Sequence, residues 1–399
     1  MEAATDSSGS RLRAVLRDEE RVTALELFFD LVFVLAITQC TALMSADPTW
    51  GGLARGLLAL GVIWWCWVGY AWLTSVVDPE EGLVRLAMFA AMAAILVAAL
   101  AVPHAFNTAG LWFAGAIGIA RAAQIALMLL ASRGQPELRH STMYGLTGST
   151  FVAIALLTAA SQVDGAVQGG LWALALALDI GGPLLAGVEG WQLVPGHFAE
   201  RHGLIIIIAL GESIVAVGAG ANAGVELGVV TAAVLGVAVA AALWWLYFDV
   251  VAIVAARRLS RAKPGREQNA IARDSFSILH LPMIAGIVLV ALGMKKTLAH
   301  VGHDLDLIPT VALYGGTALY LLAHVAFRWR NIHTLNRQRL VCATLLIALI
   351  PLAKQIPALA ALAVLTGVLL VLLAYETIHL APLRDRIRHQ LARELAAGR

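Results

Sequence analysis

Five ionisable side chains lie inside long apolar runs of the sequence and could do chemistry there: Asp30, Arg121, Asp179, Glu212 and Asp249. A charge among apolar residues at membrane depth is costly, so it faces a cavity, an opposite charge or a bound ion. Acids and an arginine in such places are typical of proton relays and of ion or solute sites. We therefore expect these five side chains to mark the functional region.

Glu26 and Asp30 stand four residues apart at the start of the first apolar run. This spacing places them on one face of a helix, where two close carboxylates repel and favour protonation of one. Glu26 is expected at the membrane interface, in contact with solvent. Asp30 lies one turn deeper and is the stronger candidate for a pore, proton or ligand role, with a buried ion pair as the alternative.

The seventh apolar run is preceded by Glu200, Arg201 and His202, and it carries Glu212 near its middle. We expect Glu212 to be protonated, paired or bound to a cation. The triplet before the run is either a structural cluster at the interface or part of a site.

Asp179 and Pro183 coincide in the sixth run. Proline cannot donate a hydrogen bond to the carbonyl four residues earlier, which here belongs to Asp179. A freed carbonyl beside a carboxylate suits a cation, and the alternative is a kink that a neighbouring helix satisfies. Arg121 is near the middle of the fourth run and is expected to pair with Asp179, Glu212 or Asp30.

A second group of ionisable residues falls in the half of the spans that we assign to the cytoplasmic side. Together they predict a polar vestibule, and histidine is the side chain that titrates near neutral pH. The members are Asp249, His280, His324, Glu376 and His379.

The elements that must position these groups are transmembrane helices. The chain has 399 residues, of which 60% are hydrophobic and 14% charged, and the apolar residues form runs long enough to cross a bilayer as helices. We predict an all-α, polytopic membrane protein with twelve spans, at 25–45, 53–74, 84–103, 109–131, 144–161, 168–187, 204–219, 227–255, 275–294, 307–327, 340–354 and 358–380.

The basic residues orient these spans. With both termini in the cytoplasm, 23 of the 28 Lys and Arg residues fall on the cytoplasmic side and only Lys295, Lys296 and Lys354 fall outside. This asymmetry is what the positive-inside rule describes. We therefore expect a multi-pass protein of the bacterial cytoplasmic (inner) membrane with both termini inside.

Two pairs of short motifs recur at an offset of 180 residues: Glu20-Arg21 with Glu200-Arg201, and Trp64-Trp65 with Trp244-Trp245. The shared offset predicts a parallel six-plus-six internal repeat. The expected parts are an amphipathic N-terminal segment (1–22), two halves of six helices (23–200 and 201–380) and a basic amphipathic tail (381–399).

Motifs for other functions are absent from the sequence. It contains no Walker loop and no Gly-x-Ser-x-Gly elbow, and Glu376-Thr377-Ile378-His379 lacks the second histidine of a zinc-protease helix. Its three cysteines have no metal-like spacing, and a net charge of +2 does not indicate nucleic acid. We expect no cofactor, no metal and no nucleic-acid partner. The lipid bilayer is the expected partner, and the oligomeric state is left open.

Two stretches resemble signatures of a known family. They are Leu25-Glu26-Leu27-Phe28-Phe29-Asp30-Leu31-Val32-Phe33-Val34, and Glu200-Arg201-His202-Gly203 leading to Leu210-Gly211-Glu212. Both are similar to signatures of the bacterial low-temperature-requirement A family, and the resemblance covers roughly residues 20–380. It implies a multi-pass membrane protein linked to growth in the cold, without a settled biochemical activity.

The first stretch is also similar to the Phe-Ser-Asp pattern in the first helix of a two-repeat, twelve-helix potassium channel family, with Phe29 where serine is expected. Our leading hypothesis is a carrier for an ion or small solute, coupled to protons. The alternatives are a channel and a non-transporting sensor or assembly factor for cold or envelope stress. A membrane-embedded enzyme ranks last.

Overall fold

The computed structural model describes residues 21–133, 135–186, 190–220 and 226–396, with side chains as far as residue 379. Every regular element in these residues is a helix, which confirms the predicted all-α class. The predicted N-terminal segment 1–22 lies almost wholly outside the described residues. Of the predicted tail 381–399, only the backbone as far as Ala396 is described, and it continues the last helix.

The chain divides into two compact units, residues 1–205 with 259–281, and residues 206–258 with 282–399. Two long helices, α8 and α12, contribute residues to both units. Each polar cluster described below lies within one unit. The predicted boundary between halves, at residues 200 and 201, and the internal repeat stay predictions.

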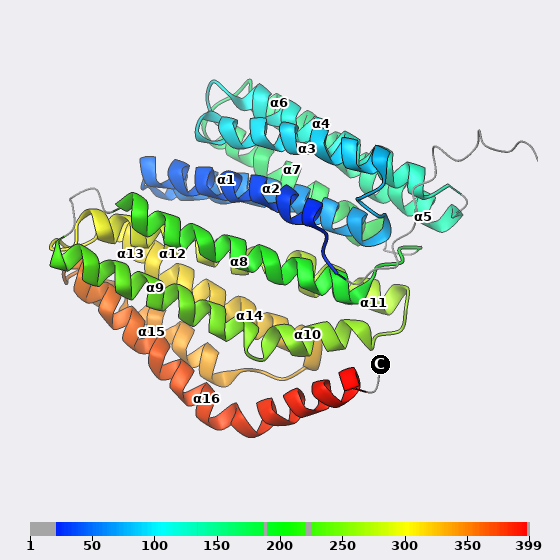
Figure 1. The fold of residues 1–399 in the computed structure, drawn as a ribbon. Helices are drawn as coiled ribbons and strands as arrows, with labels where there is room; N and C mark the ends of the chain where they lie inside the picture. The colour runs from blue at the N-terminus through cyan, green and yellow to red at the C-terminus, as the bar shows by residue number, and fades with distance from the viewer. Residues whose placement is uncertain (1–20, 134, 187–189, 221–225, 397–399) are drawn as a thin grey trace, which may run out of the picture. The chain divides into compact units, whose positions relative to one another are not determined.

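The first unit contains most of the helices in the N-terminal half of the chain (Figure 1). Its elements are α1 (Ala24–Ala46), α2 (Trp50–Val76), α3 (Gly82–Ala101), η2 (Val102–His104), α4 (Gly110–Ala131), α5 (Pro136–His140), the π-helix η3 (Ser141–Thr147), α6 (Gly148–Ala160), α7 (Gly165–Ala186), the start of α8 (Pro195–Gly220), α11 (Arg266–Ile271) and the π-helix η4 (Ala272–Ile278).

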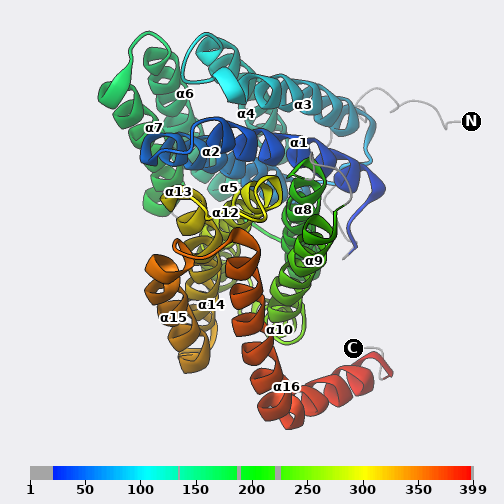
Figure 2. The same ribbon diagram turned by 90° about the vertical axis from the view of Figure 1, so that its left-hand side faces the viewer.

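The second unit holds the rest of α8 and the C-terminal helices. Its other elements are α9 (Leu227–Phe248), α10 (Val251–Ser260), α12 (His280–Ala299), α13 (Leu307–Thr310), the π-helix η5 (Val311–Gly315), α14 (Gly316–Ile332), α15 (Arg337–Ala353) and α16 (Ala358–Ala396). In this unit α16 packs on α9, and α15 packs on both α14 and α16 (Figure 2).

Helix α2 is the centre of the first unit. From Leu60 to Val76 its residues are buried on all sides, as expected for a helix that other helices surround. The Thr49 side chain starts the helix by accepting a hydrogen bond from the amide of Gly52, at 3.0 Å. Four tryptophans on α2 therefore point into the unit and can reach polar atoms of its neighbours.

Eleven helical segments within the described residues are long and apolar enough to cross a bilayer. They match eleven of the twelve predicted spans. The twelfth, predicted at 340–354, is α15 with 17 residues, or about 25 Å, which is the lower limit for crossing a ~30 Å hydrocarbon core. Large apolar side chains such as Phe151 and Leu185 point outward and are strongly exposed, as lipid contact requires.

Some helices begin earlier than the apolar runs suggested. Helix α8 begins at Pro195, nine residues before the predicted span at 204–219, so Arg201 and His202 lie within the helix rather than ahead of it. The span predicted at 275–294 likewise begins at Arg266, through α11 and η4. The hydropathy pattern did not locate these helix starts because they carry charged residues. In the folded protein, partners on neighbouring residues neutralise those charges.

Helices α12 and α14 approach closely through glycine. A Cβ added at Gly286 would lie 2.7 Å from the carbonyl oxygen of Gly316 and 2.9 Å from the amide nitrogen of Tyr320. Backbone atoms cannot move aside as a flexible side chain can, so the two helices depend on a glycine here.

Gly286→Ala should therefore lower the free energy of unfolding by about 1–3 kcal/mol, the usual cost of overpacking. The matched control is Gly115→Ala on α4, where a Cβ meets nothing within 4 Å. That change should be neutral or stabilise by up to about 1 kcal/mol through helix propensity. Thermal unfolding in detergent compares the two, and equal melting temperatures would contradict the close contact.

Candidate functional site

Asp30 on α1 is held by Arg201 on α8, deep inside the first unit. The guanidinium donates from Nη2 to Asp30 Oδ1 at 2.5 Å and from Nη1 to Thr74 Oγ1 at 2.7 Å. Trp67 donates from its indole to the same Asp30 oxygen at 2.8 Å, and the Arg201 guanidinium carbon lies 5.4 Å from the centre of its ring. Asp30 and Arg201 are completely buried, so this is a desolvated ion pair with fixed geometry.

Glu26 joins the same cluster and at the same time caps α1. Its Oε2 accepts hydrogen bonds from the amide and hydroxyl of Thr23, while its own amide donates the reciprocal bond to Thr23 Oγ1. Its Oε1 lies 2.8 Å from His197 Nε2 and 3.6 Å from Arg201 Nη1. Glu26 is fully buried, so the expectation of a solvent-exposed interface residue is wrong. The partners on α8 cause this burial.

We call Glu26, Asp30, His197 and Arg201 the Arg201 cluster. Two carboxylates face one arginine and one histidine, so a positively charged His197 makes the group neutral. Asp30 Oδ2 is buried and has no hydrogen-bond partner among the described residues. This oxygen could accept a proton without displacing an existing hydrogen bond.

Two histidines, His202 and His280, lie next to the cluster among aromatic side chains. His202 donates from Nδ1 to the carbonyl of Phe198, and His280 donates from Nδ1 to that of Ser275, at 2.8 and 3.0 Å. The rings of His202 and His280 lie 5.2 Å apart, and Trp67 stands edge-on to His202 at 5.0 Å. Because Nδ1 holds the proton in each ring, Nε2 is the basic atom. In His202 that atom is buried without a hydrogen-bond partner in the described part of the chain.

Arg121 pairs with Asp179, which is one of the three partners expected from the sequence. Arg121 Nη2 donates to Asp179 Oδ1 at 2.9 Å and to Thr150 Oγ1 at 2.6 Å, and the Thr150 hydroxyl donates to the same carboxylate oxygen at 2.8 Å. Arg121 Nη1 donates to Gln124 Oε1 at 2.8 Å. Arg121, Thr150 and Asp179 form a closed ring of hydrogen bonds, with one member each from α4, α6 and α7. Arg121 lies midway along α4.

The carbonyl that Pro183 frees belongs to Asp179, and a neighbouring helix satisfies it. Trp65 on α2 donates from its indole nitrogen to this oxygen at 3.0 Å. The kink is therefore packed rather than open. A carbonyl that already accepts a strong hydrogen bond is a poor cation ligand, which weakens the predicted cation site at this position.

Trp65→Phe should leave that carbonyl without a donor and cost about 1–3 kcal/mol, the usual penalty for an unsatisfied buried polar group. The matched control is Trp112→Phe on α4, where the indole is 70% exposed. Melting temperatures in detergent should fall for the first variant and stay unchanged for the second. A Trp65→Phe protein as stable as the wild type would show that the hydrogen bond contributes nothing.

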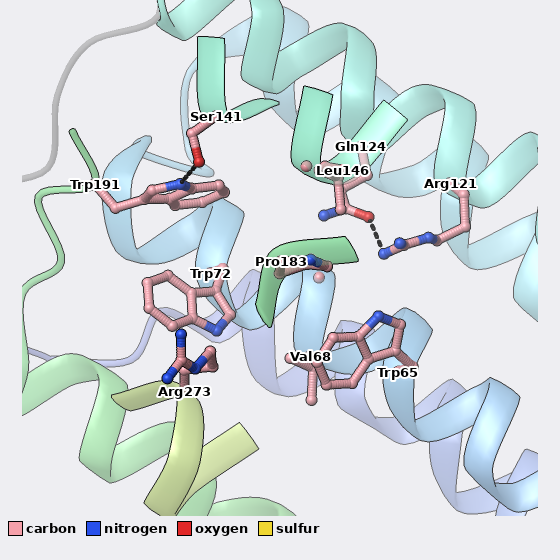
Figure 3. Close-up of a pocket in the computed structure, with 12 residues that line it drawn as sticks. Trp65, Val68, Trp72, Arg121, Gln124, Ser141, Leu146, Pro183, Trp191 and Arg273 are labelled. Atoms are coloured by element: carbon pink, nitrogen blue, oxygen red, sulfur yellow. Dashed lines mark hydrogen bonds between the residues drawn. The ribbon is translucent and has the colours of Figure 1, made fainter. Parts of the chain in front are cut away.

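A cavity of about 50 Å³ adjoins the Arg121–Asp179 pair. Figure 3 shows the indoles of Trp65, Trp72 and Trp191 around it, with Arg121 and Gln124 on one side and Arg273 on the other. Its wall includes Pro183 and the π-helix η3, which contributes Ser141. The lining is thus largely aromatic, with a few hydrogen-bonding groups that could orient a small polar molecule.

The second unit has its own polar cluster, built on Arg339 and Glu376. Arg339 makes a two-point contact to the carboxylate, Nε to Oε1 at 2.9 Å and Nη2 to Oε2 at 2.7 Å. Asn336 caps α15 and donates to Glu376 Oε1 at 3.1 Å. A cavity of about 40 Å³ adjoins the pair and is also lined by Asp249 and His324.

The predicted vestibule is therefore only partly assembled. Three of its five members, Asp249, His324 and Glu376, line that one cavity. His280 lies in the first unit against His202, and His379 is exposed and stacks on Tyr375. The sequence analysis counted Arg339 among the cytoplasmic loop residues and did not predict a role for it. The available signal was Asn336, three residues earlier, which is a typical helix-capping residue.

The other predicted residues lie apart from these clusters. Glu212 is buried on α8, eleven residues after Arg201, which is about 16 Å along the helix. Glu200 is exposed, and its carboxylate accepts a hydrogen bond from the amide of Val22 at 3.1 Å. Within the described residues no group of three or more His, Cys, Asp or Glu side chains is arranged to hold a metal ion.

The sequence profile of the bacterial low temperature requirement A protein family matches residues 21–374. The chain belongs to this family. Its two signature stretches are the ones that meet in the Arg201 cluster, since Glu26 and Asp30 come from the first and Arg201 from the second. The chain is a multi-pass membrane protein.

A curated relative is an uncharacterized protein of Rhizobium meliloti (strain 1021), 29% identical over 390 residues. The match covers 94% of this chain and 93% of the relative. No solved structure matches the chain.

Proposed function

We propose that this protein is a carrier that moves a small polar solute or ion across the membrane, with protons as the coupling ions. The observation that supports the proposal best is the tryptophan-lined cavity beside the Arg121–Asp179 pair. Its polar groups are buried midway along α4 and stand next to the proline kink of α7. Binding sites of many carriers lie at interrupted helices near the middle of the membrane.

The size of the cavity limits the solute. Its volume of about 50 Å³ is several times the about 10–15 Å³ that one water molecule needs. A solute with a few non-hydrogen atoms fits such a space. The guanidinium of Arg121 and the amide of Gln124 could hydrogen-bond it, while the indoles exclude water.

Proton coupling is supported by acids and histidines at membrane depth. Asp30 and His202 each keep one buried polar atom without a hydrogen bond among the described residues, and Glu212 is buried further along α8. Intramembrane carboxylates and histidines of this kind are common in proton relays. We propose that protons pass through these groups while residues 23–200 and 201–380 rock as two halves.

A screen and an electrical recording together test the proposal. Purified protein is screened against small solutes by thermal shift, and the solutes that stabilise it are assayed for flux in proteoliposomes. A carrier predicts slow, saturable flux that Glu212→Gln abolishes, without unitary currents in a planar bilayer. Unitary currents would instead identify a channel.

A second candidate, a non-transporting sensor or assembly factor, is favoured by one observation. The Arg201 cluster pairs its charges internally, which is what a purely structural role in fixing α1 against α8 requires. On that account Asp30→Asn and Glu212→Gln lower thermal stability, and the cellular phenotype follows protein abundance alone. A phenotype lost at normal abundance separates the carrier from this alternative.

We also propose the bacterial cytoplasmic membrane as the location, with both termini in the cytoplasm. The distribution of Lys and Arg supports this orientation, and it requires the short helix α15 to cross. Alkaline phosphatase fused after residue 399 should be inactive, and the same enzyme inserted beside Lys354 should be active. Activity of the C-terminal fusion would place the C-terminus outside and contradict the proposed orientation.

A further inference from the structure

An apolar groove of about 800 Å³ runs between α15 and α16 in the second unit. On α16 its wall is a stripe at helical spacing, and on α15 a second stripe faces it. The α16 stripe is Val364, Gly367, Val368, Val371, Leu372 and Tyr375, and the α15 stripe is Arg337, Gln338, Val341, Cys342 and Leu345.

The two stripes run in opposite directions, and an ion pair sets their register. Arg339 and Asn336 at the start of α15 both bond Glu376 near the end of the α16 stripe. Arg337 and Gln338 therefore lie at the same end of the groove as Tyr375. The rest of the lining is apolar, so the groove has one polar end and a long hydrophobic body.

The length of the groove matches one leaflet of a bilayer. From Val364 to Tyr375 the α16 wall spans eleven residues, or about 16 Å. Half of a ~30 Å hydrocarbon core is about 15 Å. An acyl chain that lies along the groove with its tail at the apolar end would place its headgroup beside Arg337.

The positive charge of Arg337, at the polar end of the groove, is available to a ligand. Arg339 is paired with Glu376, whereas Arg337 is exposed and forms no ion pair within the described residues. A basic residue at the end of a groove between membrane helices attracts anionic lipid headgroups. We propose that this groove is a binding site for an anionic phospholipid, with one acyl chain between α15 and α16 and the phosphate on Arg337.

Gly367 makes the site testable. It is exposed in the floor of the groove, and an added Cβ meets nothing within 4 Å. Gly367→Leu therefore fills the groove without forcing the helices apart. Gly115→Leu on α4 is the matched control, because that glycine also faces open space on an outward helix face. Arg337→Gln removes the headgroup contact and leaves the apolar body unchanged.

The experiment uses full-length protein in vesicles of equimolar phosphatidylcholine and phosphatidylglycerol. Either lipid carries a photoactivatable acyl chain, and cross-linked peptides are mapped. Phosphatidylglycerol should label residues 341–345 and 364–375 about fivefold more than phosphatidylcholine, the preference that one basic residue gives at an anionic surface. Arg337→Gln should abolish this preference, and Gly367→Leu should abolish labelling of the groove by both lipids.

Gly115→Leu should label as the wild type does. Labelling that is equal for the two lipids, or a preference that persists in Arg337→Gln, would overturn the proposal. So would groove labelling that is unchanged in Gly367→Leu. Melting temperatures of the three variants should match the wild type in detergent, so a loss of labelling reports the groove rather than the fold.

Discussion

Arg201→Met is expected to lower the free energy of unfolding by about 3–5 kcal/mol, which is the largest effect of any single change considered. The substitution keeps the aliphatic volume but leaves Asp30 and Glu26 without their shared guanidinium. Both carboxylates are completely buried. Breaking a buried ion pair by removing one partner costs this much because an uncompensated charge stays in a low-dielectric interior.

The matched control for this prediction is another Arg–Asp pair in the same chain. Arg55 and Asp47 are in contact near the start of α2, but their side chains are 39% and 35% exposed. Arg55→Met should cost about 0–1 kcal/mol, since water screens and replaces an exposed ion pair. Thermal or SDS-induced unfolding of both variants in one detergent makes the comparison.

Adding Asp30→Leu to Arg201→Met should recover part of the loss, because it removes one of the unpaired charges. A coupling energy of about 0.5–3 kcal/mol between the two positions is expected for residues in direct contact. Strictly additive effects would show that Arg201 and Asp30 do not interact in the folded protein.

The second prediction concerns the Arg121–Asp179 pair, where the two partners should behave differently. Asp179→Asn keeps an oxygen that can accept from Arg121 and Thr150 but removes the counter-charge of the buried guanidinium, so stability should fall, though less than on loss of Arg121 itself. Flux of the transported solute should fall about 10- to 100-fold, since a hydrogen bond to a charged group contributes about 1.5–3 kcal/mol.

Arg121→Gln should lose both stability and flux. It leaves the Asp179 carboxylate, which is 15% exposed, without its cation, and the expected cost approaches about 3–5 kcal/mol. Melting temperature and proteoliposome flux measured on the same preparations separate the two variants. If Asp179→Asn transports as well as the wild type, the pair is structural and the cavity beside it is not the transport site.

Much of the architecture could be predicted from the sequence because lipid imposes it. A bilayer admits only helices of sufficient length, so apolar runs located eleven spans directly. The start of α8, and the start of the span that runs through α11 and η4 into α12, were missed for a physical reason. Arg201 and Arg273 look incompatible with a span until their partners, Asp30 and Asp274, are known.

The candidate site was predicted residue by residue but not as an arrangement. Asp30, Arg121, Asp179 and Arg201 were each singled out, yet their pairing is a matter of which helices are neighbours. Asp30 and Arg201 are 171 positions apart, and no local pattern links them. Trp65 was noted only as part of a repeated Trp-Trp pair and Trp67 not at all, although their indoles donate to the backbone carbonyl of Asp179 and to the carboxylate of Asp30.

The most direct measurement of the central claim is proton movement into proteoliposomes, followed with an internal pH dye while one stabilising solute is added outside. The carrier account predicts that the solute changes internal pH with saturable kinetics, and that Asp179→Asn reduces the rate about 10- to 100-fold in protein that is still folded at the assay temperature. Internal pH that stays the same as in protein-free vesicles for every stabilising solute, or equal rates for Asp179→Asn and wild type, would contradict it.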